Sequence, residues 1–206
     1  MTSIPYSEEW RRPLLSLLSQ AFGVEYLAYY ELQVDHWGAQ APEAMRLCLD
    51  EEGSTLLAYL LVADYLEIGS EDLYAYLYCV CTLESRRGEG IMGRLLRYEA
   101  DRLCQMGYCG LTLIPSSVEL KGYYAGVGFG PVETPIYTHE PVGSALPLLC
   151  PGQVAKGYLK SLPPADPDYP THTDSYGNTL LSPPAGWMLY PLIHRIQTPA
   201  LVQPLT

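Results

Sequence analysis

Residues 82–93 read TLESRRGEGIMG and join a predicted strand to the first turn of a predicted helix. The first N–H groups of a helix have no partner inside the helix and carry the positive end of its dipole. Gly88 and Gly90 have no Cβ atom, so their amides can approach an anion closely, and Arg87 adds positive charge. The stretch therefore predicts a phosphate site, although arginine-flanked glycines also form ordinary turns. It is neither a Walker loop, which needs Gly-Lys-Ser/Thr, nor a Gly-x-Gly-x-x-Gly dinucleotide loop.

The segments upstream of this glycine loop predict two helices followed by three strands. Apolar residues recur every three or four positions in the first two segments, and Ser7 is the predicted N-cap of the first helix. β-favouring residues flank the turn 51–53, which predicts a hairpin. Tyrosines alternate in the third strand, which places three rings on one face. The predicted elements are helices over 7–22 and 24–37 and strands over 44–50, 54–67 and 74–83.

The segments downstream predict a helix, a strand and a second helix. Apolar residues recur at helical spacing until Gly107, a residue type common just past a helix end. Residues 111–114 predict a buried strand. Ser116 and Glu119 match a capping box, which predicts a helix that begins there and runs toward Gly126.

A second motif lies at residues 121–129, which read KGYYAGVGF. A strand followed by Arg-Gly-x-Gly-Ile, then a helix, a strand and a helix ending in Tyr-x-x-x-Gly-Phe, resembles the GNAT superfamily of acetyl-CoA-dependent N-acetyltransferases. Tyr124 lies 34 positions after Gly90 (124 minus 90), which leaves room for the elements between the motifs. The resemblance covers about residues 74–132 and implies a mixed α/β (α+β) fold with a mostly antiparallel central sheet flanked by helices.

The resemblance also implies roles for individual residues. Tyr124 would donate a proton to the leaving thiolate, and Ser117 stands where many members of the superfamily have an asparagine that helps to bind the cofactor. Met92 departs from the small residue that the loop motif has at its last position. The residues implied to bind acetyl-CoA are Val80 and Thr82, through their backbone groups on the pantetheine arm, Arg87, Gly88, Gly90, Ile91, Met92 and Gly93, on the pyrophosphate, and Ser117.

The general base stays unassigned. Some relatives carry a glutamate in the strand before the second motif, but the corresponding residue here is Thr112. The remaining candidates are Glu67 at a predicted strand end, Glu84 beside the loop, and a water relay through Tyr76 or Tyr78.

Charge is unevenly distributed along the 206 residues, whose formal net charge is −11. Residues 13–85 hold twelve acidic side chains and one basic one, Arg46, whereas residues 86–102 hold five arginines. Such a negative protein would repel a nucleic acid backbone, so we expect no nucleic acid partner. The arginine-rich segment suits an anion and the acidic segment suits a cationic acceptor.

Several kinds of site and location are not indicated. The six cysteines show no Cys-x-x-Cys spacing and the four histidines show no ligand spacing, so we expect buried thiols and no metal. No segment has the roughly 18 consecutive apolar residues that span a bilayer, and the first twenty residues do not resemble a secretory signal. We therefore expect a cytoplasmic protein with no membrane partner.

The composition changes after His139, since twelve of the eighteen prolines lie between Pro141 and Pro204. We expect a GNAT domain over 1–139 and a proline-rich C-terminal extension over 140–206 that packs on it. In this extension a short helix over 153–161, a loop over 162–176 and a strand over 187–192 are predicted. It would cover the acceptor cleft or build a homodimer contact.

The expected function is transfer of an acetyl group from acetyl-CoA to an amine, on a small molecule or a peptide, by direct attack in a ternary complex. The alternative is a non-catalytic acyl-CoA sensor or interaction module, which the departures at Met92, Thr112 and Ser117 keep open. A kinase-like enzyme is disfavoured because neither a catalytic Asp motif nor a Walker lysine is present.

Overall fold

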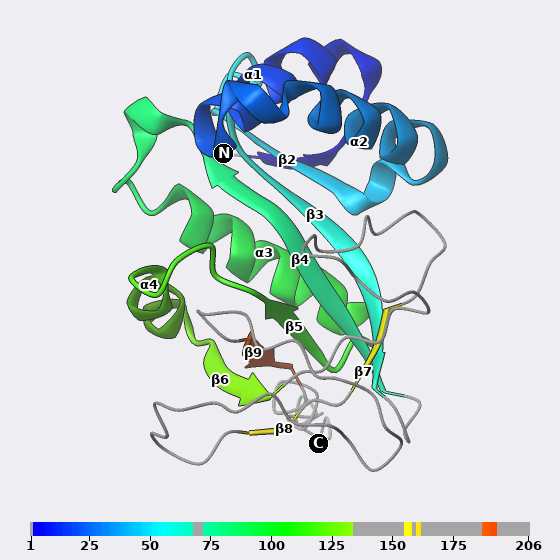
Figure 1. The fold of residues 1–206 in the computed structure, drawn as a ribbon, viewed down its shortest axis with the longest axis vertical. Helices are drawn as coiled ribbons and strands as arrows, with labels where there is room; N and C mark the ends of the chain where they lie inside the picture. Colours follow the sequence, from blue (N-terminus) through cyan, green and yellow to red (C-terminus); the bar gives the residue numbers. More distant parts are fainter. Residues whose placement is uncertain (1, 68–71, 134–154, 158–159, 162–186, 193–206) are drawn as a thin grey trace, which may run out of the picture.

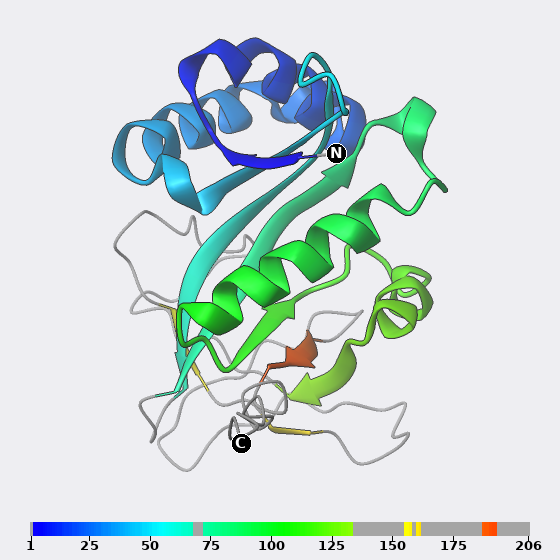
Figure 2. The same cartoon turned by 180° about the vertical axis from the view of Figure 1, so that it is seen from behind.

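The computed structural model describes residues 2–67, 72–133, 155–157, 160–161 and 187–192. Helices lie on both faces of one central sheet (Figures 1 and 2). The helices are α1 (Arg11–Phe22), α2 (Leu27–Gln40), α3 (Ile91–Gln105) and α4 (Leu120–Val127), with short 3-10 turns at Glu8–Trp10, Val24–Tyr26, Pro42–Ala44 and Glu84–Arg86. The strands are β1 (Thr2–Pro5), β2 (Met45–Leu49), β3 (Leu56–Glu67), β4 (Leu73–Thr82), β5 (Gly110–Leu113), β6 (Gly130–Glu133), β7 (Ala155–Gly157), β8 (Lys160–Ser161) and β9 (Trp187–Pro191).

The sheet is mixed and mostly antiparallel, which confirms the predicted fold class. Its strand order is β1-β2-β3-β4-β5-β9-β6-β8, and β7 adds to β3. Among the described strands, β4 with β5 and β3 with β7 are the two pairs that run in parallel. The predicted hairpin is present, with β2 and β3 antiparallel and Gly53 in its turn at φ 72°. β9 comes from the C-terminal extension and pairs on both sides, with β5 and with β6.

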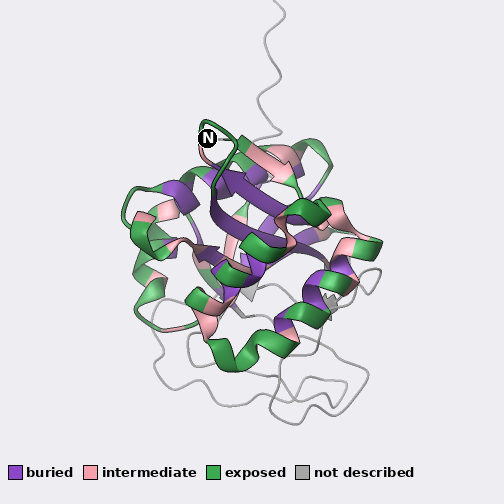
Figure 3. Ribbon diagram, turned by 90° about the horizontal axis from the view of Figure 1, so that it is seen from above, coloured by how far each residue is buried: buried purple, intermediate pink, exposed green. Residues whose placement is uncertain are grey.

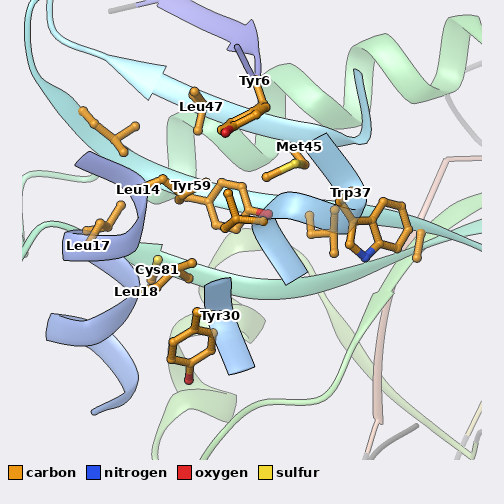
Figure 4. Close-up of a cluster of buried hydrophobic side chains, with 14 of the residues drawn as sticks. Tyr6, Leu14, Leu17, Leu18, Tyr30, Trp37, Met45, Leu47, Tyr59 and Cys81 are labelled. Atoms are coloured by element: carbon orange, nitrogen blue, oxygen red, sulfur yellow. The ribbon is translucent and has the colours of Figure 1, made fainter. Parts of the chain in front are cut away.

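Each face of the sheet has its own apolar core. Leu14, Leu18 and Trp37, from α1 and α2, pack on one face around Tyr59 of β3, as Figure 4 shows. The α3 side chains, including Leu95, pack on the other face together with side chains of β5 and α4. In Figure 3 the strands of the sheet are largely buried, whereas the helices carry both buried and exposed residues. The helical spacing of apolar residues in the sequence produces the buried sides of the helices.

Two local predictions are wrong and a third is confirmed only in part. Ser7 occupies the N-cap position of the 3-10 turn Glu8–Trp10 that leads into α1, but its hydroxyl donates to the Glu9 carboxylate at 2.9 Å and makes no capping bond. The capping box is absent because α4 begins only at Leu120, no side chain caps it, and the Ser117 hydroxyl bonds to the Glu119 carboxylate instead. The short helix over 153–161 is replaced by strands β7 and β8, each paired with a distant strand.

Strands β1 and β6 were not predicted, and the other helices and longer strands, including β9, were predicted to within a few residues. The loop expected over 162–176 lies outside the described residues. Within the described ranges no helix combines the length and the apolar character that crossing a membrane would require.

Candidate active site

β4 changes its neighbours halfway along its length. Its parallel pairing with β5 runs from Tyr74 and Gly110 to Tyr76 and Thr112 and then ends, while β4 continues to Thr82 along β3. An extra residue in β4 opposite the Tyr59–Leu61 segment forms a bulge, where Cys79 adopts φ 52°. A non-glycine residue in this conformation is uncommon and needs support from its surroundings. Beyond Tyr76, β4 therefore has one edge without a strand partner among the described residues.

A cavity of about 230 Å³ lies at this divergence. Side chains and backbone from β4, the end of β5, the turn before α4, and the helices α1, α2 and α4 line it. In Figure 1 the C-terminal ends of β4 and β5 point to different parts of the molecule. The lining residues are Phe22, Tyr30, Tyr76, Leu77, Tyr78, Cys79, Val80, Leu113, Ile114, Pro115, Ser116, Leu120 and Tyr124.

The glycine loop enters α3 with two residues in the left-handed region. Gly88 has φ 86° and Gly90, the N-cap of α3, has φ 71°. The amides of six consecutive residues, 88–93, donate no hydrogen bond to any described part of the chain. A row of unpaired amides at a helix N-terminus is a site for an anion such as a phosphate.

Arginines surround the same loop. The Arg86 guanidinium forms two bonds to the Glu89 carboxylate, at 2.7 and 2.8 Å, and these bonds lower the pKa of Glu89. Arg94 Nη1 donates to the Glu89 carbonyl at 2.9 Å, which ties the loop to the first turns of α3. Arg87 is exposed, and its Nε donates one long bond, 3.4 Å, to the Thr82 carbonyl. Arg87 and Arg97, whose guanidinium lies 3.9 Å from the position that a Cβ atom on Gly93 would take, are therefore both available to meet an anion on the amides.

Tyr124 lines the cavity from α4. The residue is 7% exposed, and its ring packs edge to face against Tyr123 and Phe129, with centroids 5.2 and 5.6 Å away. Burial raises the pKa of its phenol, and the hydroxyl makes no hydrogen bond to the described residues. A neutral phenol with a free proton beside a cavity can act as a proton donor.

The structure brings some of the predicted site residues together and separates others. Val80 and Tyr124 line the same cavity, and Thr82 follows on the same strand. Ile91 and Met92 bury their side chains in the α3 core, so only their backbone can meet a ligand. Ser117 does not line the cavity, whereas its neighbour Ser116 does.

The candidates for a general base also fall into two groups. Tyr76 and Tyr78 line the cavity, and the Tyr78 hydroxyl lies 2.8 Å from the Tyr29 hydroxyl of α2. Glu84 is exposed and does not line it, and the Glu67 side chain is outside the described part. Thr112 is fully buried and donates to the Met188 carbonyl of β9 at 3.1 Å.

Sequence reasoning did not identify Phe22, Tyr30 and Cys79 as part of this cavity. α1 and α2 approach β4 only through tertiary packing, and the bulge at Cys79 has no marker such as glycine. The one signal available was the alternation of tyrosines in β4, which predicted a ring-lined face.

A larger cavity, about 450 Å³, lies away from the loop, between the C-terminal ends of α2 and α3. Its lining includes Asp64, Arg102 and Tyr108, and the Tyr108 hydroxyl donates to Asp64 at 2.6 Å. No residue of the glycine loop reaches it. The described residues contain no group of three or more His, Cys, Asp or Glu side chains suited to a metal ion.

No protein-family sequence model and no curated protein sequence matches the chain. Solved structures do match. A GCN5-related N-acetyltransferase from Anabaena variabilis matches with a TM-score of 0.55 and 18% identity. The match covers 66% of this chain and only 33% of the length of the Anabaena protein. An aminoglycoside antibiotic 6'-N-acetyltransferase from Acinetobacter haemolyticus has a TM-score of 0.56 and 17% identity, covering 69% of this chain and 100% of that one. A GNAT family N-acetyltransferase from Escherichia coli in complex with CoA has a TM-score of 0.50 and 17% identity. The match covers 62% of this chain and 67% of that one.

Proposed function

We propose that this chain, which has the fold of the GNAT N-acetyltransferases, transfers an acetyl group from acetyl-CoA to an amine. The observation that carries the proposal is the row of six unpaired amides, 88–93, close to the cavity that Tyr124 lines. Tyr123, the residue before Tyr124, has its hydroxyl 3.9 Å from the position that a Cβ atom on Gly93 would take. The start of α3 and the α4 wall of the cavity are therefore neighbours.

The loop has the features that a pyrophosphate requires. A Cβ atom on Gly88 would meet nothing within 4 Å, so that side of the loop is open to a ligand. Each phosphate of a pyrophosphate can accept bonds from several amides, and the exposed Arg87 supplies a positive charge. The unpaired edge of β4 at Val80 and Thr82 would pair with the amide-containing pantetheine arm as with an added strand.

The proposed reaction is a direct transfer of the acetyl group from sulfur to nitrogen. The amine nitrogen forms a bond to the acetyl carbonyl carbon, and the bond from that carbon to sulfur breaks with its electron pair left on sulfur. Tyr124 donates its phenolic proton to that sulfur, and the proton lost by nitrogen restores the phenol through solvent. Tyr124 is suited to this step because it is neutral and lies in a largely apolar cavity.

A non-catalytic acyl-CoA sensor is the rival function, and two of the departures that favoured it have structural explanations. The Met92 side chain packs into the core, which leaves the row of amides intact. Thr112 is bonded to β9 and faces no ligand cavity among the described residues, so this strand position would not supply a base. The presence of Tyr124 in the cavity favours the enzyme.

The test compares two matched glycine variants, Gly88→Ala and Gly53→Ala. Both glycines have positive φ, 86° and 72°, and neither would place a Cβ atom against another atom. Each substitution therefore costs about 1–2 kcal/mol of backbone strain, and both should lower Tm by similar amounts. Only Gly88→Ala should weaken acetyl-CoA binding, by about tenfold in Kd, measured by calorimetry and by the rise in Tm that the ligand gives.

Unchanged acetyl-CoA binding by Gly88→Ala would contradict the placement of the pyrophosphate. Wild-type protein that binds acetyl-CoA and releases no thiol with any primary amine, monoamine, diamine or peptide, would favour the sensor.

A further inference from the structure

We propose that the acceptor is an apolar primary monoamine of the arylalkylamine kind, and that desolvation in the cavity, rather than a general base, supplies its neutral form. This inference rests on the proposed function. It names the substrate class for the same cavity, and it assigns the selectivity to Phe22, Tyr30, Tyr76 and Tyr78.

Aromatic rings form the wall of the cavity on the side of α1, α2 and β4. Phe22 and Tyr30 have centroids 6.0 Å apart at 44°, and Tyr76 and Tyr78 have centroids 6.2 Å apart at 29°, in a stacked arrangement. Leu77, Ile114 and Leu120 add aliphatic surface. Such a wall binds the ring or chain of an apolar amine by burying its apolar surface.

Among the described residues that line this cavity, none is Asp, Glu, Lys, Arg or His. The described acidic side chains of segment 13–85 lie elsewhere. The acidic excess that suggested a cationic acceptor therefore does not reach the cavity wall as a carboxylate. A substrate with several charges, such as a polyamine or an aminoglycoside, would lose the hydration of its extra ammonium groups without gaining an ion pair.

The titratable groups that face the cavity stay neutral at pH 7. They are Tyr30 of α2, Tyr76, Tyr78 and Cys79 of β4, and Tyr124 of α4. Burial raises the pKa of each tyrosine above its ordinary value and raises the pKa of Cys79 to about 12. In addition, the Tyr78 hydroxyl is held by Tyr29 at 2.8 Å. No phenolate or thiolate is therefore available at neutral pH to take a proton from the amine.

The same surroundings act on the amine itself. Removal from water disfavours the charged form of an amine, so a primary ammonium that enters this cavity loses a proton to solvent more readily. The neutral nitrogen then has its lone pair free to attack. The cavity would thereby perform the task that a carboxylate base performs elsewhere.

The first experiment uses the wild-type chain with acetyl-CoA and measures thiol release with phenethylamine, benzylamine, putrescine and kanamycin. We expect kcat/KM for phenethylamine to exceed that for putrescine and kanamycin by at least about tenfold. The pH at which kcat/KM levels off should follow the solution pKa of the amine, and should fall when phenethylamine is replaced by its β,β-difluorinated analogue. A levelling pH that is the same for both amines would show an enzyme group acting as the base and would overturn the inference.

The second experiment introduces a carboxylate into the wall with Phe22→Glu, and the control is Leu32→Glu on the exposed side of α2. Leu32 is 69% exposed and does not line the cavity. The ratio of kcat/KM for putrescine to that for phenethylamine should rise at least about fivefold in Phe22→Glu and stay unchanged in Leu32→Glu. If Phe22→Glu does not fold, Phe22→Leu should lower kcat/KM for phenethylamine more than that for an alkyl monoamine such as butylamine.

The rise in Tm with acetyl-CoA separates the two possible failures. Stabilisation by acetyl-CoA together with thiol release mainly from putrescine or kanamycin would overturn the inference and leave the proposed function in place. Stabilisation without thiol release from any amine would overturn both in favour of the sensor. Absence of both effects would show that no coenzyme site exists.

Discussion

At the scale of single residues, Tyr124 decides whether the cavity can support chemistry. Burial raises the pKa of this phenol, so it keeps its proton throughout the neutral and mildly alkaline range. Its hydroxyl is not used by any described neighbour, although its ring is held between Tyr123 and Phe129. A side chain whose ring is fixed and whose polar atom is free is suited to act on a ligand.

Tyr124→Phe should therefore lower kcat about 100-fold while leaving the affinity for acetyl-CoA unchanged, because only the donated proton is lost. Amine-dependent thiol release and calorimetry with acetyl-CoA measure the two quantities. Tyr98→Phe, at an exposed residue of α3, is the control and should have wild-type kcat. Equal kcat in Tyr124→Phe and wild type would exclude the phenol as the proton donor.

The residues of the site differ in how far the sequence predicted them. Gly88, Gly90 and Arg87 lie in one short segment, and local chemistry predicts its role. The glycines allow backbone amides to approach a phosphate closely, and the arginine adds positive charge. Phe22 and Cys79 belong to the cavity through the packing of α1 on β4 and through a bulge, and neither leaves a local pattern. Their roles could not be predicted because tertiary contacts create them.

At the scale of elements, a buried carboxylate joins α3 to the N-terminal edge of the sheet. Glu99 of α3 is 0% exposed and accepts bonds from Arg46 of β2 at 2.9 Å, from Ser3 of β1 at 2.9 Å and from Arg102 at 2.6 Å. Both carboxylate oxygens are satisfied, which offsets the cost of burying the charge. This group fixes the position of α3, whose first turn carries the amides of the proposed coenzyme site.

Glu99→Gln should reduce the free energy of unfolding by about 3 kcal/mol, because the buried Arg46 guanidinium would lose its countercharge. Urea denaturation of the free protein measures the loss. Glu89→Gln is the matched control, since Glu89 also pairs with an arginine but the side chains are 42% and 45% exposed. An exposed pair contributes little, so the midpoint should hardly change. Equal midpoints in both variants would contradict a stabilising role for the Glu99 network.

The elements themselves were predictable where the pattern is local. The β2–β3 hairpin follows from β-favouring runs around Gly53, and α3 follows from apolar spacing that ends at Gly107. The helix predicted over 153–161 is wrong. In its place the structure has β7 and β8, two very short strands that form by pairing with β3 and β6. Strands of two or three residues depend on distant partners, which no local pattern reveals.

At the scale of the whole molecule, tyrosines hold much of the interior together. Tyr59, Tyr76 and Tyr124 are all at most 7% exposed and lie in the cores on both faces of the sheet. Burial raises the pKa of each above the ordinary value of about 10. The folded state therefore keeps these protons when the unfolded state has lost them.

Stability should fall steeply above pH 10 as a result. Below about pH 10 both states bind the phenolic protons and no effect is expected. Above it the unfolded state binds fewer protons, so each such tyrosine lowers the free energy of unfolding by about 1.4 kcal/mol per pH unit until the folded pKa is reached. Urea midpoints at about pH 8 and about pH 10.5 test this. A midpoint that does not fall would show that these phenols ionise in the folded state.

β9 has a consequence for how the protein is made. β5 and β6 are synthesised early, yet the strand that fills the space between them is encoded only at Trp187–Pro191. While the ribosome translates the intervening residues, both strands present bare edges on which any extended chain could pair. We therefore expect the nascent protein to close this part of its sheet only after β9 has emerged, and to need those edges shielded until then.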